Sequence, residues 1–265
     1  MKSSSKILMF KCALAMIVLL SATQSFAQTN IYSGQFAVGG GYTTIVTLLN
    51  TGSAQSNGTI TFTDQQGNPF VVRVTMGGSQ SITASSLALS SFPAGGSTFI
   101  TIGAVNASDA TKSGWIRIEY TGGSVSGVAT FLQTEGTTLK TIAGVLSSQP
   151  LPFATIPVDN SGNEGRFTGF AIANQNSSSM TVRLVTLDEN GNIVDNVLPS
   201  QLNLGPRAQT AIFLHQILTN RVDFKGSMVL VGQGAQNFVV VALVINQGLL
   251  TAIPVIPEKA PIVPN

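Results

Sequence analysis

Alternation of apolar and polar residues recurs in short stretches along most of the chain. In residues 58–64 (GTITFTD), the isoleucine and phenylalanine point to one side of an extended chain and the threonines to the other. In residues 115–120 (WIRIEY), Trp115, Arg117 and Glu119 lie opposite an apolar face. A period of two residues is the pattern of a β-strand with one buried and one wet face. Such runs, bounded by Gly, Asn, Ser and Pro, predict an all-β protein.

The chain contains two copies of one pattern. Residues 43–70 align without a gap with residues 168–194, so that Asn50 matches Asn174 at a spacing of 124. Further along, the spacing falls to 112, because the second copy has a shorter connection. Each copy holds about seven short strands, which favours an antiparallel two-layer β-sandwich of the immunoglobulin or fibronectin type. An eight-stranded jelly roll is the alternative topology.

The expected domain boundaries follow from this repeat. We predict one sandwich domain over residues 28–146 and a second over residues 166–256. The connector between them, residues 147–165, contains prolines and glycines that we expect to block regular structure. A proline-rich tail, residues 257–265, ends the chain.

The N-terminal segment, residues 1–27, has the features of a cleaved secretory signal peptide. It carries three lysines, then a nine-residue apolar run, and ends with Ser25-Phe26-Ala27. The run is much shorter than the roughly 20 residues of a transmembrane helix. We therefore expect no transmembrane segment in the mature chain and a secreted location, extracellular or at the cell surface, with the periplasm as the alternative.

Composition narrows the possible functions of the exported chain. Its signal segment holds the only cysteine, Cys12, so disulfides, thiol nucleophiles and cysteine metal sites are excluded. Removing three lysines from the thirteen basic residues leaves ten, against eleven acidic ones. This balance provides no basic surface for nucleic acid. Charged residues make up 9% of the chain, so solubility rests on Ser, Thr, Asn, Gln and Gly.

A family resemblance rests on FAVGGGYTTIVTLLNTGS (residues 36–53), followed by TFTDQQGNPF, FPAGGS (92–97) and SGVATF (126–131). These stretches resemble a family of uncharacterised secreted bacterial proteins built from tandem immunoglobulin-like β-sandwich repeats. The second copy departs from the pattern, because GGGY becomes NEGRF (163–167) and AGG becomes PRA (206–208). The resemblance implies a fold and export, with no established activity and no catalytic residues to assign.

The polar stretch that begins at Asp188 can be compared with a calcium loop. A helix-loop-helix calcium site needs glycine at position six and a bidentate acid at position twelve. Here Gly191 is fourth and Pro199 is twelfth. The first copy, residues 64–67, keeps only the aspartate and the glycine, a change that a turn tolerates. The pattern predicts a type I turn that closes a hairpin, with a left-handed glycine.

Two carboxylates offer a better calcium candidate. Asp159 and Glu164 lie within six residues, together with side-chain oxygens from Asn and Ser. The alternative is an Asx-turn that starts the second copy. His215 is the only histidine, so neither a histidine metal cluster nor a histidine-dependent triad can be assembled, and we expect a loop histidine beside the core.

A candidate ligand-binding pair is Trp115 with Arg117. Alternation places both on the face opposite the core, where an exposed indole beside a guanidinium would form a platform for a sugar ring. The second copy has Ser227 in the place of the tryptophan. The alternative is that Trp115 packs under a neighbouring loop or the partner domain.

The run FVVVALVI, residues 238–245, is apolar without alternation. A strand with one wet face alternates, so both faces of this strand should be covered. The outer stripe consists of Val239, Val241, Leu243 and Ile245. Left open, it would be an adhesive patch. We expect the first domain, the tail or a second molecule to cover it; the alternative is a central strand that is simply rich in valine.

The function predicted from these patterns is a non-enzymatic secreted or cell-surface binding, adhesion or structural module. The chain shows no nucleophile elbow, phosphate loop or dinucleotide fingerprint, and no pair of acids placed for glycoside hydrolysis. The expected partner is an extracellular protein or polysaccharide surface, with self-association through the second domain as a further possibility. The alternative is a carbohydrate-binding accessory module that uses an exposed aromatic on the first domain.

Overall fold

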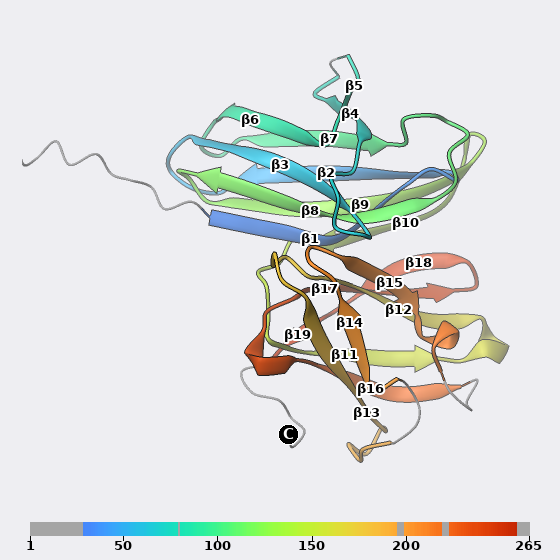
Figure 1. Ribbon diagram of the computed structural model, residues 1–265. Coiled ribbons are helices and arrows are strands. Elements are labelled where there is room, and N and C mark those ends of the chain that lie inside the picture. The colour runs from blue at the N-terminus through green and yellow to red at the C-terminus, as the bar shows by residue number, and fades with distance from the viewer. Residues whose placement is uncertain (1–28, 79, 195–198, 219–222, 259–265) are drawn as a thin grey trace, which may run out of the picture.

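A computed structural model of the chain describes residues 29–78, 80–194, 199–218 and 223–258 (Figure 1). The predicted signal peptide and residues 259–265 of the predicted tail lie outside this part. The all-β prediction is confirmed, because the described residues form antiparallel strands and three single-turn 3₁₀ helices, η1 (Gly162–Glu164), η2 (Leu214–Gln216) and η3 (Gln233–Ala235). None of these helices has the length and apolarity needed to cross a bilayer.

Ten strands form the two sheets of the first half. They are β1 (Thr29–Val38), β2 (Tyr42–Asn50), β3 (Ser56–Asp64), β4 (Val72–Met76), β5 (Ile82–Ala84), β6 (Ser86–Phe92), β7 (Ser97–Gly103), β8 (Lys112–Thr121), β9 (Val125–Glu135) and β10 (Thr138–Leu146). One sheet has the order β1-β8-β3-β6 and the other the order β10-β9-β2-β7-β4-β5.

The second half also consists of two sheets. Its strands are β11 (Phe153–Asn160), β12 (Arg166–Ala173), β13 (Met180–Leu187), β14 (Gln201–Leu204), β15 (Gln209–Phe213), β16 (Phe224–Gly232), β17 (Val239–Asn246), β18 (Leu249–Ile253) and β19 (Ile256–Pro257). Their orders are β14-β13-β16-β11-β19 and β15-β12-β17-β18. Each half buries its own apolar core between its two sheets.

The strand order corrects the prediction of an immunoglobulin topology. In an immunoglobulin sandwich the first two strands lie in the same sheet. Here β1 and β2 lie in opposite sheets, and the first eight strands pair as 1-8-3-6 and 2-7-4-5. This is the order of a jelly roll, the topology that the sequence left as an alternative. The β9–β10 hairpin then extends the second sheet beyond β2.

The two halves repeat the same strand plan. Strands β12 and β13 follow β2 and β3 at the spacing of 124, whereas β15 and β16 follow β7 and β8 at 112. Within the described ranges the second half has no counterpart of β4 and β5. The spacing between the copies falls from 124 to 112 in the region between β3 and β7, where the first half carries β4 and β5.

The expected irregular connector contains a strand. Residues 147–165 were expected to lack regular structure, but β11 lies inside this range and pairs with β16 along its whole length. Its other neighbour, β19, contacts only Ala154 and Thr155. Pro157 therefore lies where β11 has a free edge, so its missing N–H costs no hydrogen bond. Strand β11 therefore accommodates Pro157 although it belongs to the core of the second half.

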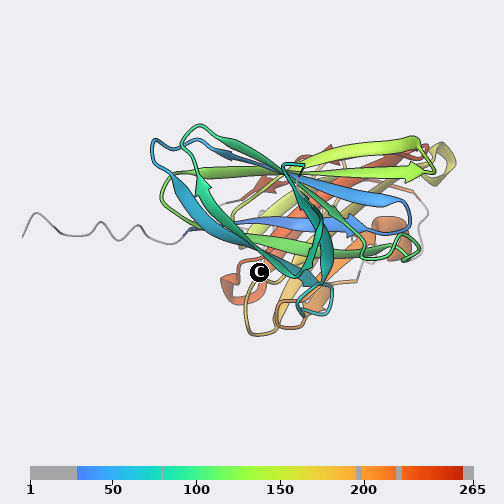
Figure 2. The same cartoon turned by 90° about the horizontal axis from the view of Figure 1, so that it is seen from above.

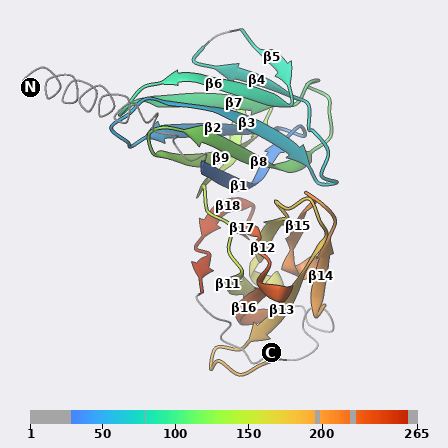
Figure 3. The same cartoon turned by 60° about the vertical axis from the view of Figure 1, so that its left-hand side comes forward.

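The halves pack against each other, as Figures 1 and 3 show from the side, and Figure 2 shows the first half lying over the second. Strands β1, β9 and β10 of the first half lie over the outer face of the β15-β12-β17-β18 sheet of the second half. The main apolar contact joins Phe131 and Val145 to Val241 and Leu243. A smaller cluster joins Tyr32 and Trp115 of the first half to Ala173 and Val239 of the second half.

Candidate functional site

The polar loop at Asp188 is a closed turn. Its carboxylate accepts backbone hydrogen bonds from Asn190 (2.9 Å) and Asn192 (2.8 Å), and the Asn192 side chain donates a third at 3.1 Å. Gly191 has φ of 82°, the left-handed conformation that the D-x-x-G pattern predicts. These hydrogen bonds, above all those from Asn192, hold the pKa of Asp188 below its usual value. The carboxylate oxygens are occupied by the turn itself.

The corresponding turn of the first half has the same hydrogen bonds. The carboxylate of Asp64 accepts from the backbone of Gln66 (2.9 Å) and Asn68 (2.7 Å), and Gly67 has φ of 92°. This turn has an additional role, because the backbone N–H of Gln209 in the second half donates to the Gln65 oxygen at 3.0 Å. One copy of the turn thus faces solvent and the other joins the two halves.

The proposed calcium ligands are held by an arginine. The Arg166 guanidinium pairs with Glu164 and, at 3.1 Å from Nε to Oδ2, with Asp159. The Ser161 hydroxyl donates to the other oxygen of Asp159 at 3.1 Å. Among the described residues no three His, Cys, Asp or Glu side chains form a group that could hold a metal ion. A positive charge of the protein itself lies between the two carboxylates, which argues against calcium there.

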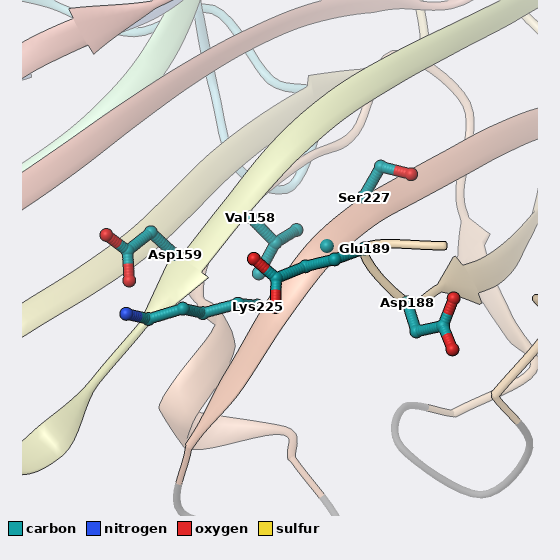
Figure 4. A pocket seen from close by; sticks show the side chains of 7 residues that line it. Val158, Asp159, Asp188, Glu189, Lys225 and Ser227 are labelled. Atoms are coloured by element: carbon teal, nitrogen blue, oxygen red, sulfur yellow. The ribbon is translucent and has the colours of Figure 1, made fainter. Parts of the chain in front are cut away.

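An acidic depression at one end of the second half has a volume of about 540 Å³ (Figure 4). Asp159 and the end of Lys225 lie on one side of it and Asp188 on the other. A general acid needs a carboxyl group with a raised pKa, usually through burial. Asp188 instead has a lowered pKa, and Asp159 is paired with Arg166. Asp188 therefore lacks the raised pKa of a general acid; the third carboxylate of the lining is Glu189.

The ring of His215 lies beside two phenylalanine rings. Its ring centroid is 4.4 Å from that of Phe167 and 5.9 Å from that of Phe213. The side chain is exposed at the start of a single 3₁₀ turn. This position matches the loop histidine that the sequence predicts.

Trp115 is buried, which corrects the hypothesis of a sugar platform. Its side chain is 3% exposed, and its ring centroid lies 6.1 Å from that of Tyr32. Ala173 and Val239 of the second half complete the cluster. Alternation correctly placed the indole opposite the core of its own half, but it does not reveal that the other half covers this face. Arg117 remains accessible and pairs with Glu119 at 3.5 Å.

The apolar stripe on β17 lies in the contact between the halves. Val239 packs against Trp115, while Val241 and Leu243 pack against the β9–β10 hairpin. Ile245 is half-buried near the end of the strand. The intervening residues Val240 and Ala242 point into the core of the second half. Both faces of β17 are therefore covered within one chain, so the stripe is not free for self-association.

An open apolar face, which sequence reasoning missed, lies on the six-stranded sheet of the first half. Leu146, Val128, Thr47 and Phe99 stand side by side across β10, β9, β2 and β7. Phe99 is 58% exposed and Leu146 is 74% exposed. We call the outward residues of these four strands the open face; they are Thr43, Ile45, Thr47, Leu49, Ser97, Phe99, Thr101, Ser126, Val128, Thr130, Leu132, Ile142, Gly144 and Leu146.

The composition of the open face distinguishes it from the rest of the surface. Seven of its residues are aliphatic or aromatic, four are threonine, two are serine, one is glycine, and none carries a charge. Charged side chains stand at two of its borders: Lys140 pairs with Glu135 at 2.6 Å beside β10, and Arg73 of β4 lies next to Gly103 of β7. The sequence contained a sign of this apolar face in the alternation of β2 and β7. The outward positions of these strands include isoleucine, leucine and phenylalanine as well as threonine.

A cleft of about 400 Å³ lies beside the contact between the halves. Its walls come from the end of β10 and the residues that follow, and from β17 and β18. Val145, Leu146, Ile253 and Val255 give it an apolar lining. Its lining includes no Asp, Glu, His, Lys, Arg or Tyr side chain, and its side-chain polar groups are the hydroxyls of Ser147 and Ser148.

The fold defines an all-β protein of two similar, closely packed halves. A scan of protein-family models found no match to the chain, and a search of curated proteins found none.

Proposed function

We propose that this protein is a non-enzymatic exported module that binds, adheres or builds structure through the open face. We infer that its two halves are sandwich domains of one kind, joined into a single unit. The observation that carries the proposal is the open face, whose four strands present apolar and hydroxyl side chains and no charge. Monomeric soluble proteins rarely expose large contiguous apolar patches, and such patches often mark interaction sites.

The chemistry of the face indicates the class of partner. Without charges it offers no attraction to phosphate, so nucleic acid and anionic membranes are poor partners. A row of side chains across β-strands is flat, and threonine hydroxyls both donate and accept hydrogen bonds. The partners that fit are neutral protein or polysaccharide surfaces outside the cell.

A carbohydrate-binding module is the second candidate, because the first half does expose an aromatic ring. That ring is Phe99, at 58% exposure, and not Trp115. A phenyl ring on a flat face can stack on the apolar side of a sugar. This candidate predicts that Phe99→Ala abolishes retention on a polysaccharide that binds the wild-type chain, whereas Trp115 variants act only through stability.

Arrays of glycans and extracellular-matrix proteins test the proposed function. Residues 28–265 are applied in parallel with Phe99→Asp, and with Ile193→Asp as the matched control. Ile193 is 51% exposed and lies in the distant turn of the second half. We expect binding or self-association that only Phe99→Asp removes. Turnover of substrate in a broad ester and glycoside panel, lost on changing one acid, would contradict a non-enzymatic role.

A further inference from the structure

The internal duplication gives the open face a structural counterpart in the second half. Ala171 pairs with Val241 on one side and with Ala211 on the other. In the first half, Thr47 pairs in the same way with Val128 and with Phe99. The row Val241-Ala171-Ala211 therefore occupies the place of the row Val128-Thr47-Phe99.

The two equivalent faces differ in what covers them. In the second half the row is covered, since Ala171 is fully buried, Val241 is 4% exposed and Ala211 is partly buried. The body that covers it is the first half, a unit of the same fold. In the first half the row is open, with Phe99 at 58% exposure. The chain thus shows one case in which this face is covered, and the cover is another copy of the unit.

The surface that covers the second half occurs only once in each chain. It consists of Tyr32, Trp115 and Phe131, together with small apolar residues of β9 and β10. At the equivalent positions of the second half stand Thr155, Ser227 and Val244. Because the second half lacks these aromatic residues, it cannot cover the open face of another chain in the same way. A head-to-tail filament is therefore not supported.

We propose that two copies of this chain pack their open faces against each other as a two-fold symmetric dimer. Isologous pairing places the same patch on both sides, which an uncharged face allows without like-charge repulsion. Two β-sheets stack face to face at about 10 Å, with their side chains interdigitated. The threonines can then form hydrogen bonds across the contact, while Phe99 and Leu146 supply apolar area. This dimer rests on the proposed role of the open face and specifies its partner.

The size of the face sets the strength of the dimer. Strands about 4.8 Å apart and rows about 6.7 Å apart give the open face an extent of about 20 Å by 20 Å. This is below the roughly 800 Å² per partner of a standard interface. We therefore expect a reversible dimer with a dissociation constant on the order of micromolar or weaker, formed at the high local concentration of a surface-associated protein.

Sedimentation velocity of residues 28–265 over about 1 to 500 μM, a range chosen for micromolar affinity, tests the proposal. We expect the wild-type chain to shift from monomer to dimer. Phe99→Asp and Thr101→Asp, both on the open face, should stay monomeric, and Ile193→Asp should behave as wild type. Circular dichroism and the midpoint of unfolding identify a variant that is monomeric because it is misfolded. In that case the other open-face variant tests the dimer.

The outcomes separate the dimer from the broader function. A wild-type chain that stays monomeric over the whole range overturns the dimer, as does a folded Phe99→Asp that still dimerises. If that monomer binds a polysaccharide or a matrix protein and Phe99→Asp does not, the open face is a site for a foreign partner and the proposed function stands. A monomer that binds nothing on the arrays overturns both.

Discussion

The indole nitrogen of Trp115 donates a hydrogen bond of 2.8 Å to the backbone oxygen of Arg207, across the contact between the two halves. Three further hydrogen bonds cross the same contact. Gln209 donates from its backbone to Gln65 and from its side chain to Gly34 (3.1 Å), and the Leu250 N–H donates to the Thr141 hydroxyl at 2.6 Å. Together with the buried apolar cluster, these bonds fix the halves in one arrangement.

Replacing Trp115 should destabilise the whole molecule. Trp115→Phe removes the hydrogen bond to the backbone oxygen of Arg207, which costs about 0.5–1.5 kcal/mol. Trp115→Ala adds a large cavity, for a total of about 3–5 kcal/mol. Urea unfolding measures both. Phe99→Ala, at an exposed aromatic, is the control and should change the free energy of unfolding by less than about 1 kcal/mol. A Trp115→Ala chain as stable as wild type would contradict this packing.

The two D-x-x-G turns should differ in their tolerance of a side chain. At Gly67 an added Cβ would lie 2.3 Å from the Pro206 oxygen in the other half, whereas at Gly191 nothing lies within 4 Å. Both residues have positive φ, so alanine costs about 1–2 kcal/mol of backbone strain at each. Gly67→Ala should cost more, because it also pushes the halves apart. Chemical denaturation of the two variants side by side gives the comparison; equal losses would show that this contact can relax.

The repeated asparagines should be structural clamps. Asn50 is fully buried and donates to the backbone oxygens of Ala54 (2.9 Å) and Phe92 (3.2 Å). Asn174 donates in the same way to Ser178 (2.8 Å) and Gly205 (2.7 Å). Alanine at either position removes these hydrogen bonds, at about 0.5–1.5 kcal/mol for each. Thermal unfolding of Asn50→Ala and Asn174→Ala tests this, and a loss below about 0.5 kcal/mol would contradict the assignment.

Acid should loosen the turn at Asp188. Its pKa is lowered in the folded state by hydrogen bonds from Asn192 and Asn190. A group with a depressed folded pKa contributes stability above its unfolded pKa, near 3.8, and loses this contribution as the pH falls through the folded pKa. Carboxyl chemical shifts measured by NMR between about pH 2 and 6 should therefore give Asp188 a pKa below this unfolded value. Asn192→Ala should raise that pKa, and no change would show that another group sets it.

Much of the local structure follows from residue patterns. The period of two in β3 and β8 gives the faces on which Ile60, Phe62, Ile116 and Ile118 are buried. The repeated asparagine and D-x-x-G motifs mark the same corners in both halves. The unbroken apolar run of β17 indicates burial on both faces, because a strand with a wet face alternates. These features depend on neighbours in the chain, which the sequence displays directly.

Other features depend on partners that are distant in sequence. Alternation cannot distinguish a covered outward face from an open one, so it treats Trp115 and Phe99 alike, although the first is buried and the second is exposed. Likewise, Pro157 suggests an irregular segment until the short β19 shows that β11 has a free edge there.

The sequence by itself determined an all-β chain with a duplicated unit, because periodicity and turn chemistry act over a few residues and repeat along the chain. Only the tertiary structure decided the jelly-roll strand order of the first half, the burial of Trp115 beneath the second half and the exposure of the six-stranded sheet. Strand order and sheet stacking join residues up to 175 positions apart, as in the bond from Gln209 to Gly34. Contacts of that range depend on how whole sheets fit together, which no local pattern encodes.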